Sequence, residues 1–152
     1  MGKFDHYKVE VTKDTTQQCT LFGIALSEDV DGTAIHPVLT VRPAWDVNTD
    51  YANARIKASK GRSRTIQKKG IEARDIRTIR KEDVELYATH IVIGWVHVVD
   101  EDGEEVPFTA EDCRDFLASI PEAEFDELRN FCNDYQNWGM DPLDSEGIAG
   151  NL

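Results

Sequence analysis

The stretch from 109 to 138, TAEDCRDFLASIPEAEFDELRNFCNDYQNW, decides the fold class because it carries two helical patterns separated by a proline. Thr109 can cap the first helix, which should end at Ile120 because the residue before a proline disfavours helical backbone. The inner face of this helix is apolar: Cys113, Phe116 and Leu117. The second helix is predicted over residues 122–138, with apolar side chains at helical spacing: Phe125, Leu128, Phe131, Tyr135 and Trp138. Gly139 fits the position that follows a helix end.

A third helix is predicted over residues 81–95, because apolar side chains keep the helical period from Val84 to Trp95. Acidic residues in its first turn favour this start, since the positive end of the helix dipole attracts anions. Between this helix and Thr109, two short apolar runs flank Asp102-Gly103, which predicts a small hairpin or turn. The apolar stripes of the three helices should close on one another.

The N-terminal part has the patterns of short strands. Residues 6–12 alternate polar and apolar side chains, which predicts a strand. Asp31-Gly32 lies between the apolar runs 21–26 and 35–41, which predicts a hairpin. The sequence therefore predicts an α+β fold, in which a short N-terminal β-hairpin or small antiparallel sheet is followed by a mainly α-helical C-terminal part.

The domain organisation predicted from these patterns is a single domain. Its strand region covers residues 1–45, and its mainly helical region covers residues 46–138. Residues 46–60 should form a thinly apolar helix, and residues 60–80 a basic loop or arm without apolar periodicity. Residues 139–152 contain Pro, Gly, Asp and Ser with few apolar side chains, and they read as a flexible tail.

The charges are distributed unevenly within a net charge of −12. Residues 55–81 carry 11 basic and 2 acidic side chains, whereas residues 82–152 carry 2 basic and 19 acidic ones. The opposite charges can neutralise each other, within one fold or between the subunits of a homo-oligomer. A basic arm for nucleic acid is the alternative. We favour neutralisation, because the acidic remainder would repel phosphates at long range.

No catalytic, phosphate-binding or metal-binding motif occurs in the sequence. The acidic run 100–105 fails the ligand spacing of a calcium loop, and His90 and His97 lack the closer spacing and third ligand of a zinc site. The three cysteines are widely spaced and are interpreted as free, buried packing residues. No apolar run approaches the length of a membrane span, and no N-terminal signal is present. We therefore expect no enzyme, no cofactor, no metal and no membrane partner.

Aromatic side chains gather in the second half of the sequence. Most of them should be core residues that join the three helices. A few can instead anchor a partner, because Trp and Tyr bury much area at low entropic cost. The partner-binding candidates are Trp95, Phe108, Tyr135 and Trp138.

An ordered set of motifs resembles a known family. The segments THIVIGW at 89–95, DEDGEEVPFT at 100–109, FL at 116–117 and FDEL at 125–128 are similar to the pattern of tail assembly chaperones of long-tailed (siphovirus-type) bacteriophages and prophages. The resemblance also takes in an upstream strand and Asn-x-x-Tyr within 38–51, and it covers about 90–100 of the 152 residues.

The resemblance implies a protein of viral morphogenesis that binds the tape measure protein, keeps it soluble and helps recruit tail tube protein. Many such chaperones are made in a short form and a longer frameshifted form, and the family carries no catalytic residues. They act in the host cytoplasm during virion assembly. The alternatives are a structural component of the virion, from the tail or the head, and a regulator that binds nucleic acid through residues 55–81.

Overall fold

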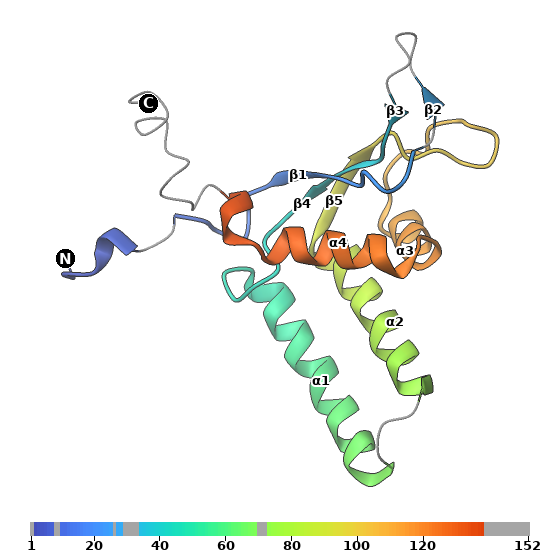
Figure 1. The fold of residues 1–152 in the computed structure, drawn as a ribbon. Helices are drawn as coiled ribbons and strands as arrows, with labels where there is room; N and C mark the ends of the chain where they lie inside the picture. Colours follow the sequence, from blue (N-terminus) through green and yellow to red (C-terminus); the bar gives the residue numbers. More distant parts are fainter. Residues whose placement is uncertain (1, 8–9, 26, 29–33, 70–72, 139–152) are drawn as a thin grey trace.

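The computed structural model describes residues 2–7, 10–25, 27–28, 34–69 and 73–138. Within this part, an antiparallel sheet built mostly from N-terminal strands is combined with four α-helices, which lie mainly in the C-terminal part. The predicted α+β fold class is confirmed (Figure 1). None of the described helices is both long enough and apolar enough to cross a membrane.

The sheet has the strand order β1 (Gln17–Thr20), β4 (Val38–Val41) and β5 (Val92–Val96), with β4 in the centre and antiparallel to both neighbours. Leu39 on β4 pairs with Cys19 on one side and Trp95 on the other. Leu39 and Val41 are fully buried and alternate with half-buried neighbours, as expected for a central strand with one face on the core.

A second, two-stranded ladder joins β2 (Ser27–Glu28) to β3 (Ala34–Ile35). It lies between β1 and β4 in the chain, so the predicted hairpin around Asp31-Gly32 is confirmed. The turn itself, residues 29–33, lies outside the described residues.

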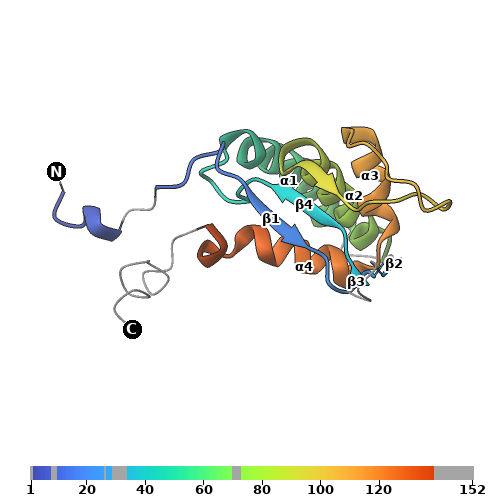
Figure 2. The ribbon, with the colours of Figure 1, turned by 90° about the horizontal axis from the view of Figure 1, so that it is seen from above.

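Four α-helices complete the fold: α1 (Thr49–Lys69), α2 (Ala73–His90), α3 (Ala110–Ser119) and α4 (Glu122–Asn133). In the view from above, α4 runs on one side of the strands and α1 with α2 on the other (Figure 2). The α4 helix reaches α2 through the rings of Phe125 and Tyr87, whose centroids are 5.5 Å apart. The α1–α2 hairpin, residues 49–90, extends away from the sheet, α3 and α4 (Figure 1).

The prediction of a helix over 81–95 is wrong at its C-terminal end. The helix α2 starts earlier and ends at His90, and residues 92–96 form β5. Val92, Ile93 and Val96 are β-branched and suit a strand, and pairing with β4 satisfies their backbone groups. The apolar spacing from Val84 fits both structures, so periodicity alone could not place the boundary.

The prediction of a basic loop or arm over 60–80 is also wrong. Residues 60–69 continue α1 and residues 73–80 belong to α2, while 70–72 lie outside the described residues. Lys and Arg are good helix formers, so a basic segment without apolar periodicity can still be helical.

Two further elements differ from prediction. No strand covers 6–12 in the described part, where a 3-10 turn, η1 (Asp5–Tyr7), appears instead. The last helix breaks at Asp134 and continues as a 3-10 turn, η2 (Tyr135–Trp138). The predicted cap of α3 is confirmed, because Thr109 Oγ1 accepts a hydrogen bond of 3.0 Å from the Asp112 N–H. Gly139 and the predicted flexible tail lie outside the described residues.

Asn48 is the one buried polar residue in the part of the chain that the structure describes. Its Oδ1 accepts a hydrogen bond of 3.3 Å from the Tyr51 N–H and so caps α1. Its Nδ2 donates to the carbonyl of Pro43 at 3.0 Å and to that of His90 at 3.2 Å. One amide therefore links the segment after β4, the start of α1 and the end of α2.

We predict that Asn48→Ala lowers the free energy of unfolding by about 2–4 kcal/mol, since it removes a cap and leaves one buried and one half-buried carbonyl without this donor. Asn48→Asp should cost at least as much, although Asp caps helices equally well, because its carboxylate would face those carbonyls. Urea unfolding followed by circular dichroism measures both. The matched control is Asn53→Ala, at an exposed position of α1. Equal losses for Asn48→Ala and Asn53→Ala would contradict this role.

Candidate interaction surface

The structure places the four predicted anchors in two separate aromatic clusters. In the first, Trp95 meets Phe108 and Phe116 with ring centroids 5.1 and 5.5 Å apart. The Trp95 Nε1–H donates to the Val106 carbonyl at 2.7 Å. These contacts fix the connection between β5 and α3, so Trp95 and Phe108 have a structural role, and partner binding by them stays a prediction.

The second cluster is built around Trp45, which sequence reasoning did not single out. Its ring meets Tyr135 at 5.1 Å and Trp138 at 5.8 Å between centroids. Trp138 is buried, whereas Tyr135 is 54% exposed. Of these two predicted anchors, only Tyr135 offers a largely accessible ring to a partner.

The acidic segment 100–105 forms a turn. Asp100 Oδ1 accepts backbone hydrogen bonds from Asp102 at 2.9 Å and Glu104 at 3.0 Å, and Gly103 has a φ of 79°, which glycine adopts without strain. His90 and His97 lie on either side of β5, so they share no helical face. Among the described residues, no group of three metal-ligating side chains comes together.

The three cysteines are buried, as predicted. Burial raises the pKa of the Cys19 thiol, beside Glu127, and that of the Cys113 thiol to about 12. Burial also raises the pKa of Cys132 well above its ordinary value. All three thiols are therefore protonated at neutral pH, and a protonated thiol is a poor nucleophile and a poor metal ligand.

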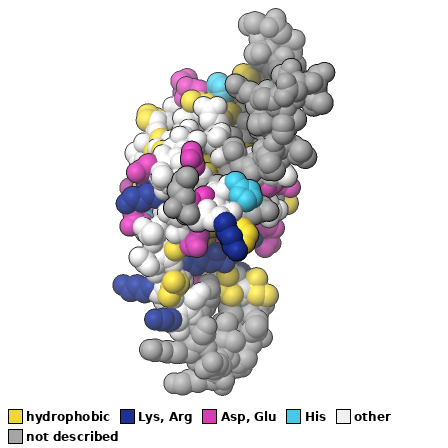
Figure 3. All heavy atoms as spheres, turned by 90° about the vertical axis from the view of Figure 1, so that its left-hand side faces the viewer, with side chains coloured by type: hydrophobic (Ala, Val, Ile, Leu, Met, Phe, Trp, Pro, Cys, Tyr) yellow, Lys and Arg dark blue, Asp and Glu magenta, His cyan; other side chains and the backbone are white. Residues whose placement is uncertain are grey.

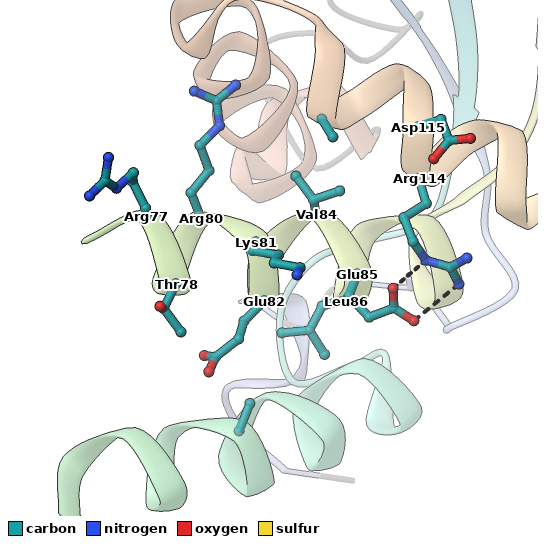
Figure 4. A pocket seen from close by; sticks show the side chains of 12 residues that line it. Arg77, Thr78, Arg80, Lys81, Glu82, Val84, Glu85, Leu86, Arg114 and Asp115 are labelled. Atoms are coloured by element: carbon teal, nitrogen blue, oxygen red, sulfur yellow. Dashed lines mark hydrogen bonds and ion pairs between the residues drawn. The ribbon is translucent and has the colours of Figure 1, made fainter. Parts of the chain in front are cut away.

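A groove of about 630 Å³ lies along α2, with α1 on one side and α3 on the other (Figure 4). Val84 and Leu86 of α2 are nearly buried and contribute apolar surface to it. Ala58 of α1 and Ala118 of α3 line its two sides with small side chains. A concave apolar surface of this volume is typical of binding sites.

Charged side chains surround the groove in an ordered way. Arg114 of α3 forms a two-pronged ion pair with Glu85 of α2, drawn in Figure 4. Arg80 donates to the carbonyl of Ile120 at 3.0 Å and lies 3.9 Å from Glu122.

Two further cations of α2, Arg77 and Lys81, line the groove and are exposed. Neither has an ion pair or hydrogen bond among the residues whose side chains are described.

A smaller polar notch of about 210 Å³ lies where α1, α2 and α4 meet. Asp83 on α2 and Arg129 on α4 form an ion pair of 2.9 Å there, and Arg129 also pairs with Asp126. Burial raises the pKa of the adjoining Tyr51 and Tyr87. Tyrosines with raised pKa values stay neutral, so this notch is a structural ion-pair network that ties α4 to α2.

Comparison with protein families matches residues 46–138 to the model of the YdaY prophage protein family. The match spans more than half of the chain. The chain belongs to the YdaY prophage protein family. Comparisons with curated protein sequences and with solved structures found no significant match. The phage origin implied by the resemblance is thus confirmed. The family match does not establish that the protein is a tail assembly chaperone.

The matched region of this YdaY-family chain contains every residue of the groove and all four predicted anchors. It also contains the basic hairpin. On the face shown in Figure 3, acidic side chains lie over the upper and middle parts of the molecule, and the described charged side chains lower down, over the hairpin, are basic. Hydrophobic side chains appear among them, and Ile56 of α1 and Ile76 of α2 are 54% and 58% exposed.

Sequence reasoning missed the groove because it interpreted residues 60–80 as a loop. The only signal in the sequence was that Ala58 and Ala118 are small. Helical spacing could not show that these two residues, on different helices, line the same surface. Only the packing of α1 and α3 against α2 makes these residues two sides of one surface.

We predict that iodoacetamide leaves Cys19, Cys113 and Cys132 unmodified in the folded protein and alkylates all three in urea. The reason is that burial removes both access and the reactive thiolate. Mass spectrometry counts the adducts. An Ala123→Cys variant, at an exposed position of α4, is the control and should be alkylated once without urea. Full alkylation of the wild-type protein under native conditions would contradict the burial described here.

Proposed function

We propose that this YdaY-family protein is a tail assembly chaperone, which binds the tape measure protein and helps recruit tail tube subunits in the host cytoplasm. The observation that carries the proposal is the apolar groove on α2. A long helical client exposes apolar stripes before it is assembled, and a groove between helices can cover such a stripe. The role is binding and requires no reacting group.

The charge of the protein supports this role. Its net charge is −12, and residues 82–152 contribute most of the acidic side chains. A strongly charged surface keeps a complex with an apolar client in solution. Membership of a prophage family and the resemblance of segments 89–109 and 116–128 to tail assembly chaperones support the same role.

A structural component of the virion is the second candidate. The strand β5 lies at an edge of the sheet, and its Ile93 and Val96 are 38% and 51% exposed. Exposed edge strands can pair with a strand of another subunit, as assembling proteins do. This candidate differs from the chaperone in its fate, since a structural protein stays in the finished particle.

Co-expression with the tape measure protein of the same prophage tests the proposal. We expect the tape measure protein to become soluble and to co-purify with the chain, and mass spectrometry of finished particles to lack the chain. Insoluble tape measure protein in the presence of the chain would contradict the chaperone role. Stoichiometric amounts of the chain in particles would favour the structural role instead.

A further inference from the structure

We propose that the groove on α2 binds an amphipathic helix with an acidic end, and that Arg77 and Lys81 pair with the carboxylates of that end. The inference rests on the proposed chaperone function and names the kind of client segment that is bound. Three properties of the groove support it: its shape, its apolar surface, and two cations that have no acidic partner among the described side chains.

The shape of the groove suits a helix. Its α2 side runs from residue 77 to residue 86, a length of about 14 Å at the rise of an α-helix. Helices α1 and α3 flank α2 there, as Figure 4 shows. An added helix would therefore lie along α2, between α1 and α3. Ala58, Thr78 and Ala118 are small and let its backbone come close.

The apolar surface of the groove favours a protein partner over nucleic acid. Ala58 and Ala118, with the small accessible parts of Val84 and Leu86, offer contacts that apolar side chains can fill and that a phosphate backbone cannot. Phosphates spread along the whole groove would also meet the carboxylate of Asp115 at its far end, whereas a helix that is acidic only at the Arg77 end would not.

The cations of the groove define the charge of the partner. Arg80 and Arg114 already have acidic partners within the protein, whereas Arg77 and Lys81 have none among the described side chains. The latter two are four residues apart, so they lie on one face of α2 and repel each other. Carboxylates of a bound helix would relieve this repulsion.

The direction of the bound helix follows from the ends of the groove. Arg77 lies at the end towards the tip of the hairpin, and Asp115 lies at the opposite end (Figure 4). The hairpin segment 55–81 carries 11 basic and 2 acidic side chains, so the tip attracts anions. The acidic end of the partner helix should therefore point to the hairpin tip.

A second copy of the chain does not supply such a helix from its described residues. The apolar faces of α3 and α4 are already used in the core, as the buried side chains of Cys113, Leu117, Phe125 and Leu128 show. The charge of Arg77 and Lys81 points instead to an acidic segment of another protein, which under the proposed function belongs to the tape measure protein.

Binding of the tape measure protein, and of synthetic peptides of about 20 residues that tile it, tests the inference. Ala118→Trp fills the groove from an exposed position, and Ala123→Trp on α4 is the matched control. We expect fluorescence anisotropy to show binding of an acidic amphipathic peptide that Ala118→Trp weakens roughly tenfold or more. The control should stay within about twofold of wild type, with unchanged circular dichroism for both variants.

A charge-reversal pair provides an independent arm. The double variant Arg77→Glu and Lys81→Glu should weaken binding of the acidic peptide roughly tenfold, and a peptide whose acidic end is changed to lysine should regain affinity for that variant. The control is Lys3→Glu, at an exposed position near the N-terminus. Loss of binding on adding salt should be steeper for wild type than for the double variant.

The outcomes separate the two proposals. If wild-type protein binds neither the tape measure protein nor any peptide, the chaperone function fails and this inference fails with it. If wild type binds but Ala118→Trp and the charge reversal change nothing, the groove is not the site and the chaperone function stands. Competition by duplex DNA for the peptide, or a loss of self-association as the sole effect of Ala118→Trp, would also overturn the inference.

Discussion

The arrangement of the whole molecule depends on the amide of Asn48. The side chain sits where β4 has ended, α1 begins and α2 returns to the sheet, and it satisfies a backbone group in each of these three segments. A buried amide with all its partners is specific, because any shift of one segment leaves a polar group without a hydrogen bond. The base of the α1–α2 hairpin is thereby fixed to the sheet.

Because its base is fixed to the sheet, the α1–α2 hairpin places the basic segment apart from the rest of the protein. Residues 55–81 are strongly basic and residues 82–152 strongly acidic, and the hairpin extends beyond the sheet, α3 and α4 (Figure 1). The two kinds of charge meet on α2, where Arg80 lies 3.9 Å from Glu122. Within the acidic segment, Glu85 pairs with Arg114 and Asp83 with Arg129. These pairs hold α3 and α4 to α2, and the groove lies where α3 stops and the basic hairpin continues.

Elements with local signals could be predicted from the sequence, and elements set by tertiary packing could not. The cap of Thr109, the stop at Ile120-Pro121 and the turn at Gly103 each depend on a few neighbouring residues, and all three were predicted. The boundary between α2 and β5 depends on pairing with β4, which is about 50 residues away in the chain. The helical spacing of apolar residues from Val84 therefore predicted a helix that is too long at its C-terminal end. The sequence did not reveal that Trp95 is half-buried and Trp138 buried, because their ring contacts come from other segments of the chain.

If the proposed function holds, the fixed hairpin base presents α2 and α3 as the surface that receives the client. Hydrogen–deuterium exchange of the chain, free and in complex with the tape measure protein, tests this most directly. We expect complex formation to slow exchange in 77–86 of α2 and 114–118 of α3. Slower exchange confined to the segment 97–108 or to 135–138, with α2 unchanged, would contradict it.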